Sequence, residues 1–563
     1  MKPTCAFFLA AALLMPSIAS AQRINHAGRI LGPVPAPLTG PVLFDTPAAD
    51  AIMSALQIMP TTNAFNEDVS GLPLDPMSGA IMMQIESDLA AGRRTLIAFH
   101  EMNYVLVPDS QPVMSMLMTN YPDESDDTNL ATGIASFAFP GNLPLETWPS
   151  ETGATTLTAW QTMCSGDCHS ITLMPALGRF WETWQTQHTT NTPAWEASNV
   201  ARFDITSNTL RPDGWTSGDA AGLPMLPALV RYDECQRGLV EHAVRLVVHT
   251  SRGAHIYPAT HHAGTAAAPR PVMGQRIRLR GSFAIPGTWS VCERAVARAL
   301  QTYGGIVADN GGFFSFSVTP DERFAAGEFS HLTSIPIASA FEVVQATGAT
   351  GGPRSPGAPT VDAGPDRTTN VGASLSLTGT ATGTGITTTW YLYPYATAPG
   401  TVMFGTPMAL TTTATFSAVG DYIVMLRATD HVHAVAYDAL TVHVAAAGTD
   451  AGPIVDAGTD AAVLVDAGTD AATPGTDAGP PSDSGVDAAT SRTDASATRD
   501  TGARADGASN ADAGSAPAPA SCACGIASHS TSSGALVSLL ALGALFSRRR
   551  ATTSGARTSA RFR

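Results

Sequence analysis

The chain has 563 residues and a formal net charge of −16, with 44% hydrophobic and 14% charged residues. Length alone predicts roughly three or four domains. The negative balance disfavours nucleic acid as a partner, because like charges repel. Much of this charge lies in one acidic segment near the C-terminus, so it says little about what the folded part binds.

The first 21 residues have the features of a secretory signal peptide. An apolar run extends from Ala6 to Met15, and the small residues Ala19-Ser20-Ala21 supply a cleavage site. We therefore predict export and cleavage after residue 21. An N-terminal extension follows over residues 22–47, and a β-rich extracellular domain over residues 48–350.

Alternating apolar residues and one helix define the predicted architecture of this domain. Residues 239–249 alternate apolar and polar side chains, which is typical of a half-buried strand in an antiparallel sheet. Ser290 and Glu293 have the spacing of a capping box, and Gly304 ends the apolar periodicity that follows. We expect a mostly β, α+β domain with this helix packed against a sheet.

Four cysteines of this domain predict two disulfide bonds, because an even number in an exported chain is typical of a disulfide framework. They are Cys164, Cys168, Cys235 and Cys292. Cys164 and Cys168 could close a tight local loop or each reach another cysteine, so three connectivities stay open. A metal site that includes His169 is the alternative, although we expect neither metal nor cofactor.

No recognised catalytic motif is present in this domain. Gly-x-Ser-x-Gly, His-Glu-x-x-His and phosphate-binding loops do not occur. Hydrolysis of a glycosidic bond needs two carboxyl groups, one of them with a raised pKa. The candidate catalytic acids, together with one histidine, are Glu182, Asp219, Asp233, Glu234, Asp309 and His261. Three of these acids belong to a loop rich in glycine and proline, Gly214–Glu234.

Aromatic residues beside one of these acids are candidate sugar-binding residues. Trp181 and Trp184 flank Glu182 and could stack on sugar rings, although aromatic residues in strands more often pack in a core. Nearby, Asp167 and His169 would lie on one face of a strand that runs into the core. We expect them to form a structural Asp–His pair.

A ladder of arginines offers a second candidate binding surface. Arg276, Arg278 and Arg280 alternate along QRIRLRGSF and could line a groove for an anionic polymer. A solvated strand face is the alternative. A polysaccharide lyase would combine these arginines with His169 or His261 as the base.

Several stretches between about Asn63 and Val344 resemble a widespread group of secreted bacterial proteins. The matching stretches include NAFNEDVSGLPLDP, YVLVPDSQPV, GWTSGDAAGLPMLPALVRYDE, YPATHHA, MGQRIRLRGSF and ALQTYGGIVADNGG. The resemblance implies a secreted, β-rich domain, and it implies no known reaction.

Residues 360–444 change to short alternating strands with Gly- and Thr-rich turns, which predicts a small β-sandwich. This stretch resembles a PKD domain. The hallmark positions are Asp362-Ala363-Gly364-Pro365, Gly372, Trp390, Gly420, Tyr422 and Asp430. The resemblance implies an immunoglobulin-like fold with Trp390 in the core and Tyr422 beside the turn at Gly420. HVHA replaces the usual Gly-containing turn after the aspartate.

The C-terminal part is predicted to be a stalk and a tail. Residues 445–520 are rich in Asp, Ala, Gly and Thr, which predicts a disordered linker. Residues 521–550 combine a cysteine pair, a short hydrophobic segment and an arginine cluster, and a basic tail follows over 551–563. This order resembles the sorting tails of myxobacterial surface proteins, which implies processing by sorting machinery and anchoring at Cys522 or Cys524. A short hydrophobic helix as a simple membrane anchor is the alternative.

Together, these features predict a surface-displayed extracellular protein whose first domain binds or cleaves polysaccharide. The alternative is a non-catalytic adhesin or structural surface protein that contacts another surface protein. The two differ in one geometric requirement: catalysis needs at least two of the named acids, or a base and an arginine, to converge in one open cleft.

Overall fold

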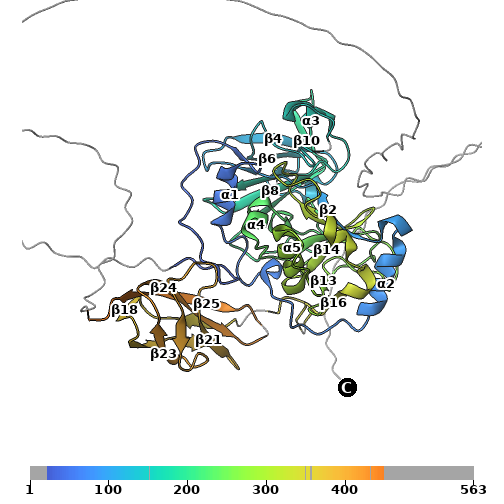
Figure 1. Ribbon diagram of the computed structural model, residues 1–563. Helices are drawn as coiled ribbons and strands as arrows, with labels where there is room; N and C mark the ends of the chain where they lie inside the picture. The colour runs from blue at the N-terminus through green and yellow to red at the C-terminus, as the bar shows by residue number, and fades with distance from the viewer. Residues whose placement is uncertain (1–21, 151, 349, 355–357, 432, 449–563) are drawn as a thin grey trace, which may run out of the picture. The chain divides into compact units, whose positions relative to one another are not determined.

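The computed structural model describes residues 22–150, 152–348, 350–354, 358–431 and 433–448. The predicted signal peptide, most of the stalk, the sorting tail with Cys522 and Cys524, and the basic tail lie outside these residues. Within the described ranges the chain is mostly β with a few short helices, as predicted (Figure 1). No helix of this described part combines the length and apolar character needed to cross a membrane.

A six-stranded mixed sheet holds the largest core of the first domain. Its order is β16 (Phe341–Val344), β13 (Arg276–Leu279), β14 (Gly305–Asn310), β12 (Val244–Val248), β15 (Phe314–Val318) and β2 (Leu96–His100). Within this sheet the prediction of antiparallel pairing is wrong for two pairs, because β12 runs parallel to β14 and β15 runs parallel to β2. All of β12 is buried, as is typical of strands covered on both faces.

The predicted helix is confirmed as α5 (Val291–Thr302), which packs into this core. The Ser290 hydroxyl accepts a hydrogen bond from the Glu293 amide, and the Glu293 carboxylate accepts one from the Ser290 amide. Gly304 follows the helix with φ of 64°, and a Cβ there would lie 2.5 Å from the Ile277 carbonyl oxygen. Glycine is therefore required at the stop.

Two five-stranded sheets complete the β structure of the first domain. The first has the order β1 (Val42–Leu43), β3 (Val105–Leu106), β7 (Ser170–Met174), β8 (Arg179–Trp184) and β11 (Asn199–Asp204). The second has the order β5 (Thr128–Asn129), β6 (Ile134–Ala138), β4 (Val113–Met118), β10 (Trp195–Ala197) and β9 (Gln187–His188). The remaining α-helices are α1 (Pro47–Ser54), α2 (Ser78–Asp88), α3 (Leu157–Met163), α4 (Tyr232–Arg237) and α6 (Ile337–Ala340).

Strand β8 belongs to two cores at once. Phe180 packs in one cluster with Met225 and Leu226, whereas its neighbour Trp181 packs in another. Successive side chains of a strand point to opposite faces. Glu182 therefore lies on the Phe180 side and is carried into the protein interior, where it is fully buried.

The second domain is a β-sandwich. One sheet has the order β18 (Arg367–Asn370), β25 (Ala436–Ala445), β24 (Gly420–Thr429) and β21 (Thr387–Leu392). The other has the order β19 (Ser374–Thr378), β23 (Thr411–Phe416) and β22 (Val402–Phe404), and β17 (Thr360–Asp362) pairs with β20 (Thr380–Thr382). Trp390 and Tyr422 are buried in its core, as the resemblance implies.

Both predicted disulfides form, and the structure settles their connectivity. Cys164 pairs with Cys168 in a tight loop before β7. Cys235 of α4 pairs with Cys292 of α5 across 57 residues. These four cysteines are therefore not metal ligands.

We predict that Ser290→Ala lowers the free energy of unfolding of the first domain by about 1 kcal/mol, because it removes the N-cap acceptor of α5. Urea denaturation measures the change. The exposed Ser282→Ala is the matched control and should leave the midpoint unchanged. Equal midpoints for both variants would contradict this role.

Removal of the two disulfides should have unequal effects. By loop-closure scaling, loss of the pair separated by 57 residues costs about 4 kcal/mol, and loss of the pair separated by 4 costs about 2 kcal/mol. Denaturant unfolding of Cys235→Ala/Cys292→Ala and Cys164→Ala/Cys168→Ala without reductant compares them. A larger loss for the short loop would contradict this ranking.

Candidate functional site

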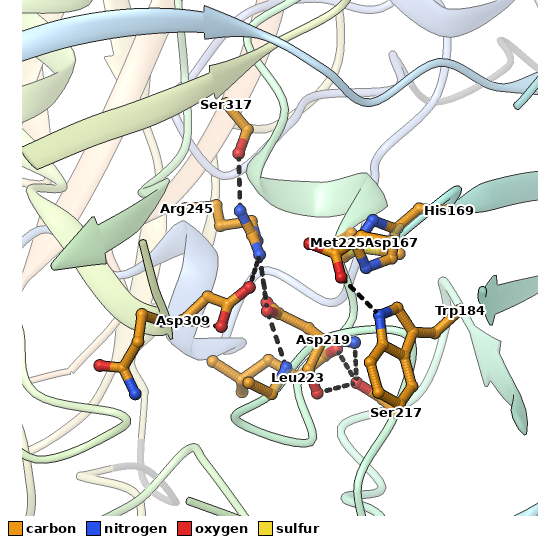
Figure 2. A network of polar contacts seen from close by, with 12 residues as sticks. Asp167, His169, Trp184, Ser217, Asp219, Leu223, Met225, Arg245, Asp309 and Ser317 are labelled. Carbon is orange, nitrogen blue, oxygen red and sulfur yellow. Dashed lines mark hydrogen bonds and ion pairs between the residues drawn. The ribbon is translucent and has the colours of Figure 1, made fainter. Parts of the chain in front are cut away.

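The candidate site is centred on Arg245 of β12, whose side chain is only 2% exposed. Its guanidinium donates hydrogen bonds to Asp219 at 3.0 and 3.2 Å, to Asp309 at 2.8 Å and to Glu101 at 3.1 Å. It also donates to the Ser317 hydroxyl at 3.2 Å (Figure 2). Three carboxyl groups thus share one buried cation.

Strand order explains how this group assembles. Asp309, Arg245 and Ser317 lie on the adjacent strands β14, β12 and β15, and Glu101 directly follows β2, the next strand. The β12–β14 register shifts between Leu246 and Val247, which places Asp309 opposite Val247. Residues two apart on a strand share a face, so this irregularity puts Asp309 on the face of Arg245.

Burial changes the protonation of these acids. It raises the pKa of Glu101 to about 7, although Arg245 opposes the shift. It likewise raises the pKa of Asp219 to about 6, again against the attraction of Arg245. Near neutral pH the cluster therefore holds both protonated and ionised carboxyl groups.

A second polar group lies beside the first and contains a histidine. The His169 Nδ1 atom lies 2.9 Å from a Glu146 carboxylate oxygen. Burial lowers the pKa of His169, but Glu146 outweighs burial and raises the pKa to about 9. The predicted pairing of Asp167 with His169 is replaced, because Glu146 is the partner of the histidine. His169 is therefore an imidazolium at neutral pH.

Asp167 is the half-buried acid of this second group. Its carboxylate accepts a hydrogen bond of 3.0 Å from the indole Nε1 of Trp184, as Figure 2 shows. Burial raises the pKa of Asp167 to about 6, with His169 opposing. The Cys164–Cys168 disulfide closes the loop that carries Asp167. Asp167 thus combines solvent access with a proton held close to neutral pH.

Strained backbone flanks the same residues. Thr147, Cys168 and Gln185 have φ values of 65°, 40° and 53°, and they adjoin Glu146, Asp167 and Trp184. A non-glycine residue in this region costs on the order of 1–3 kcal/mol. Strain of this kind concentrates at functional sites, and three of the six such residues in the described part of the chain adjoin this group.

The Gly214–Glu234 loop connects the site to β8. The Glu182 carboxylate accepts hydrogen bonds from the Met225 amide at 2.9 Å and the Leu226 amide at 2.8 Å. Burial raises the pKa of Glu182 to about 8, while these amides oppose the rise. The Nδ1 atom of half-buried His261 lies 2.7 Å from the Ala220 carbonyl oxygen. The first part of the loop therefore meets both Glu182 and His261.

The other predicted acids of the loop lie in a different cluster. Asp233 accepts hydrogen bonds from Arg231 at 3.1 Å and Arg237 at 2.8 Å. Glu234 pairs with Arg231 at 2.7 Å and with His242. Burial raises the pKa of Glu234, but the attraction of Arg231 and His242 outweighs burial and lowers this pKa to about 2. These two acids form ion pairs around α4 and do not join Arg245.

The aromatic and arginine candidates differ from one another in burial and in hydrogen-bond partners. Trp181 is buried and donates to Asp127 at 2.8 Å, whereas Trp184 is half-buried beside Asp167. Arg276 is buried and donates to backbone carbonyls, so the interpretation of a solvated face is wrong for it. Arg278 is buried against Glu342 at 2.8 Å, and Arg280 lies partly exposed 3.5 Å from the same carboxylate.

The sequence candidates did not include Arg245, Glu101, Glu146 or Ser317, and Asp167 was expected only to form a structural pair with His169. Arg245 interrupts the short apolar stretch AVRLVV, and a charged residue in a buried strand is a usable signal. Glu101 and Glu146 follow a strand and a loop and carry no local signal. In the described ranges, no group of three or more His, Cys, Asp or Glu side chains is arranged to hold a metal ion.

Comparison with known proteins identifies similar structures but no family. No family and no curated protein matches the chain. The solution structure of the PKD domain of the KIAA 1837 protein matches at 24% identity, covering 16% of this chain and 92% of that one with a TM-score of 0.14. The PKD domain of human KIAA0319 matches at 21% identity, covering 19% and 100% with a TM-score of 0.15.

A third match is to Drosophila N-cadherin EC1-3 at 12% identity, covering 64% of this chain and 96% of that one with a TM-score of 0.14. The TM-scores of all three matches are too low to carry any argument about function.

The raised pKa values predict a specific pH dependence of stability. Unfolded aspartates and glutamates ionise at 3.8 and 4.5, whereas Asp167, Asp219 and Glu101 hold their protons to about 6, 6 and 7. Between these unfolded and folded pKa values, the folded domain binds more protons than the unfolded chain does. Its free energy of unfolding therefore falls as pH rises. The His169 contribution is lost as pH rises through about 9.

Urea denaturation at about pH 5 and about pH 8 measures this dependence, with the lower stability expected at the higher pH. Asp167→Asn should reduce the difference, because it removes one of the shifted groups. A free energy of unfolding that rises between these pH values would contradict the assignment.

Proposed function

We propose that the protein is displayed on the cell surface and that its first domain binds and cleaves polysaccharide. The observation that carries the proposal is the convergence of acids, a guanidinium and an imidazolium around Arg245 and Asp167. Glycoside hydrolysis requires a carboxylic acid that is protonated near neutral pH and a second, ionised carboxylate. Both kinds of group are supplied here.

Asp167 is the best supported proton donor. It is half-buried and holds its proton to about pH 6, so it meets both the requirement for access and the requirement for a raised pKa. Glu182 is less suited to this role, because it is fully buried and bonded to backbone amides. Asp219 and Asp309, held by Arg245, are the candidates for the second carboxylate.

An aromatic pair adjoins the proposed donor. Trp184 donates to Asp167, and the Tyr121 ring lies 6.2 Å from the Trp184 ring, centroid to centroid. Half-buried aromatic side chains offer apolar faces on which sugar rings can stack. Surface display rests on the predicted signal peptide, stalk and sorting tail, together with the PKD-like sandwich.

One observation favours the alternative, a non-catalytic adhesin that contacts another surface protein. Arg245 is buried and pairs with all three surrounding carboxyl groups. A satisfied buried network of this kind can serve only to fix the fold. The two functions are therefore distinguished by whether substitution of Asp167 lowers the rate of a polysaccharide-cleaving reaction.

The experiment is a screen of the full exported chain for reducing ends released from polysaccharides. We expect Asp167→Asn to lower the rate on any substrate found by about 10²–10⁴-fold, because it removes the proton donor. The exposed Asp109→Asn is the matched control. An unchanged rate in Asp167→Asn would contradict the assignment, and binding without cleavage would favour the adhesin.

A further inference from the structure

We propose that the first domain has a second binding site, which takes a single aliphatic chain from solution. The proposal goes beyond polysaccharide binding and does not depend on it, because the pocket that carries it shares no lining residue with the Arg245 and Asp167 groups. This pocket has a volume of about 470 Å³. Small-molecule sites typically have volumes of about 300–1,000 Å³, so the pocket is large enough to hold a ligand.

The pocket lies over an incompletely covered part of the apolar core. Its lining comes from the N-terminal extension, α1, the segment after β3, the turn between β7 and β8, and the end of β11. Ile52 and Leu56 of α1 pack against the core that contains Phe180, yet both are only partly buried. Because both also line the pocket, apolar surface of this core is left uncovered there.

The chemistry of the lining selects for hydrocarbon. The apolar lining residues are all aliphatic or proline, and no aromatic side chain occurs among the described residues of the lining. Sugar rings bind proteins largely by stacking on aromatic faces, so this pocket is not a further sugar subsite. Aliphatic walls instead favour burial of methylene groups, which gain about 25 cal/mol per Å² of apolar surface removed from water.

The polar groups of the lining are bonded within the protein or lie at the rim. The Arg23 guanidinium donates to the carbonyl oxygens of Gly32 and Ala55, both at 2.8 Å. The Gln57 amide also donates to backbone carbonyl oxygens. The other polar lining residues, at 109–110 and 206, are exposed. The interior therefore offers no free charge to a ligand, and a polar head group would stay in water at the rim.

Four prolines stiffen the walls of the pocket. They are Pro35 and Pro37 of the N-terminal extension, Pro108 after β3, and Pro175 in the turn between β7 and β8. Proline fixes its own φ near −65°, so these segments have little freedom to close over the gap. Walls that are already ordered lose little conformational entropy when a ligand binds. The pocket is therefore preformed for its ligand.

The mouth of the pocket is too small for a bilayer. Val34 and Leu177 are its large apolar residues with high exposure, at 71% and 53%. Binding to a membrane surface requires a continuous apolar face, which two side chains do not provide. The ligand is therefore a chain that enters from solution.

Calorimetric titration of the full exported chain with 1-alkanols, from 1-hexanol to 1-decanol, tests the proposal. We expect saturable binding of one molecule, with the affinity rising about fourfold for each added methylene group until the chain fills the pocket. No saturable binding, or an affinity that does not depend on chain length, would overturn the proposal. The polysaccharide screen is unaffected by either outcome.

Two variants locate the binding site. Ala176→Trp places an indole at an exposed lining position and should weaken binding at least about tenfold, because it fills the pocket. Leu177→Asp should weaken binding by burying charge against the ligand at the mouth. Leu130→Asp is the matched control, since Leu130 is another leucine in an exposed turn, at 68% exposure. It should bind like the wild type.

Thermal unfolding establishes that each variant is folded. Unchanged affinity in both Ala176→Trp and Leu177→Asp would contradict the location. Vesicles of phosphatidylcholine and phosphatidylglycerol form the second arm, and we expect no co-sedimentation. Vesicle binding that Leu177→Asp abolishes and Leu130→Asp retains would assign the chain to a membrane lipid and overturn the source inferred here.

Discussion

The buried guanidinium of Arg245 is the interaction on which the arrangement of the first domain depends. A single buried cation binds side chains from β14, β15, the end of β2 and the Gly214–Glu234 loop. Removing one partner of a buried ion pair leaves an uncompensated charge, which is strongly destabilising. The four segments are therefore fixed relative to one another by electrostatics as well as by apolar packing. Any chemistry at Asp167 would take place beside this rigid group.

The same constraint explains why the carboxyl groups differ in protonation. Among the described residues of the site there are fewer cations than acids, and burial penalises each uncompensated charge. The result is a graded set, in which Asp167, Glu101 and Glu182 hold their protons to about pH 6, 7 and 8. Stability and proton availability are thus coupled, since conditions that ionise the acids also weaken the fold.

Local sequence signals predicted the parts of this fold that depend on local contacts. The α5 capping box, the Gly304 stop and the core position of Trp390 each follow from a few neighbouring residues or from the family resemblance. Asp219 and Asp309 were predicted as candidates, but not their meeting at Arg245. That meeting requires the parallel pairing of β12 with β14 and the register shift beside Val247. Both depend on residues far apart in the chain, for which the alternation of apolar residues carries no signal.

The hydrogen bonds of Glu182 restrict where this domain can gain or lose residues. The loop is held at Asp219 by Arg245 and at Met225 by Glu182, so the chain between these two points has a fixed length. An inserted residue there would draw one end away from its partner, whereas the exposed turn at 130–132 lies outside these two points. Natural variants of this domain should therefore differ in length at the turn and keep the spacing from Asp219 to Met225 constant.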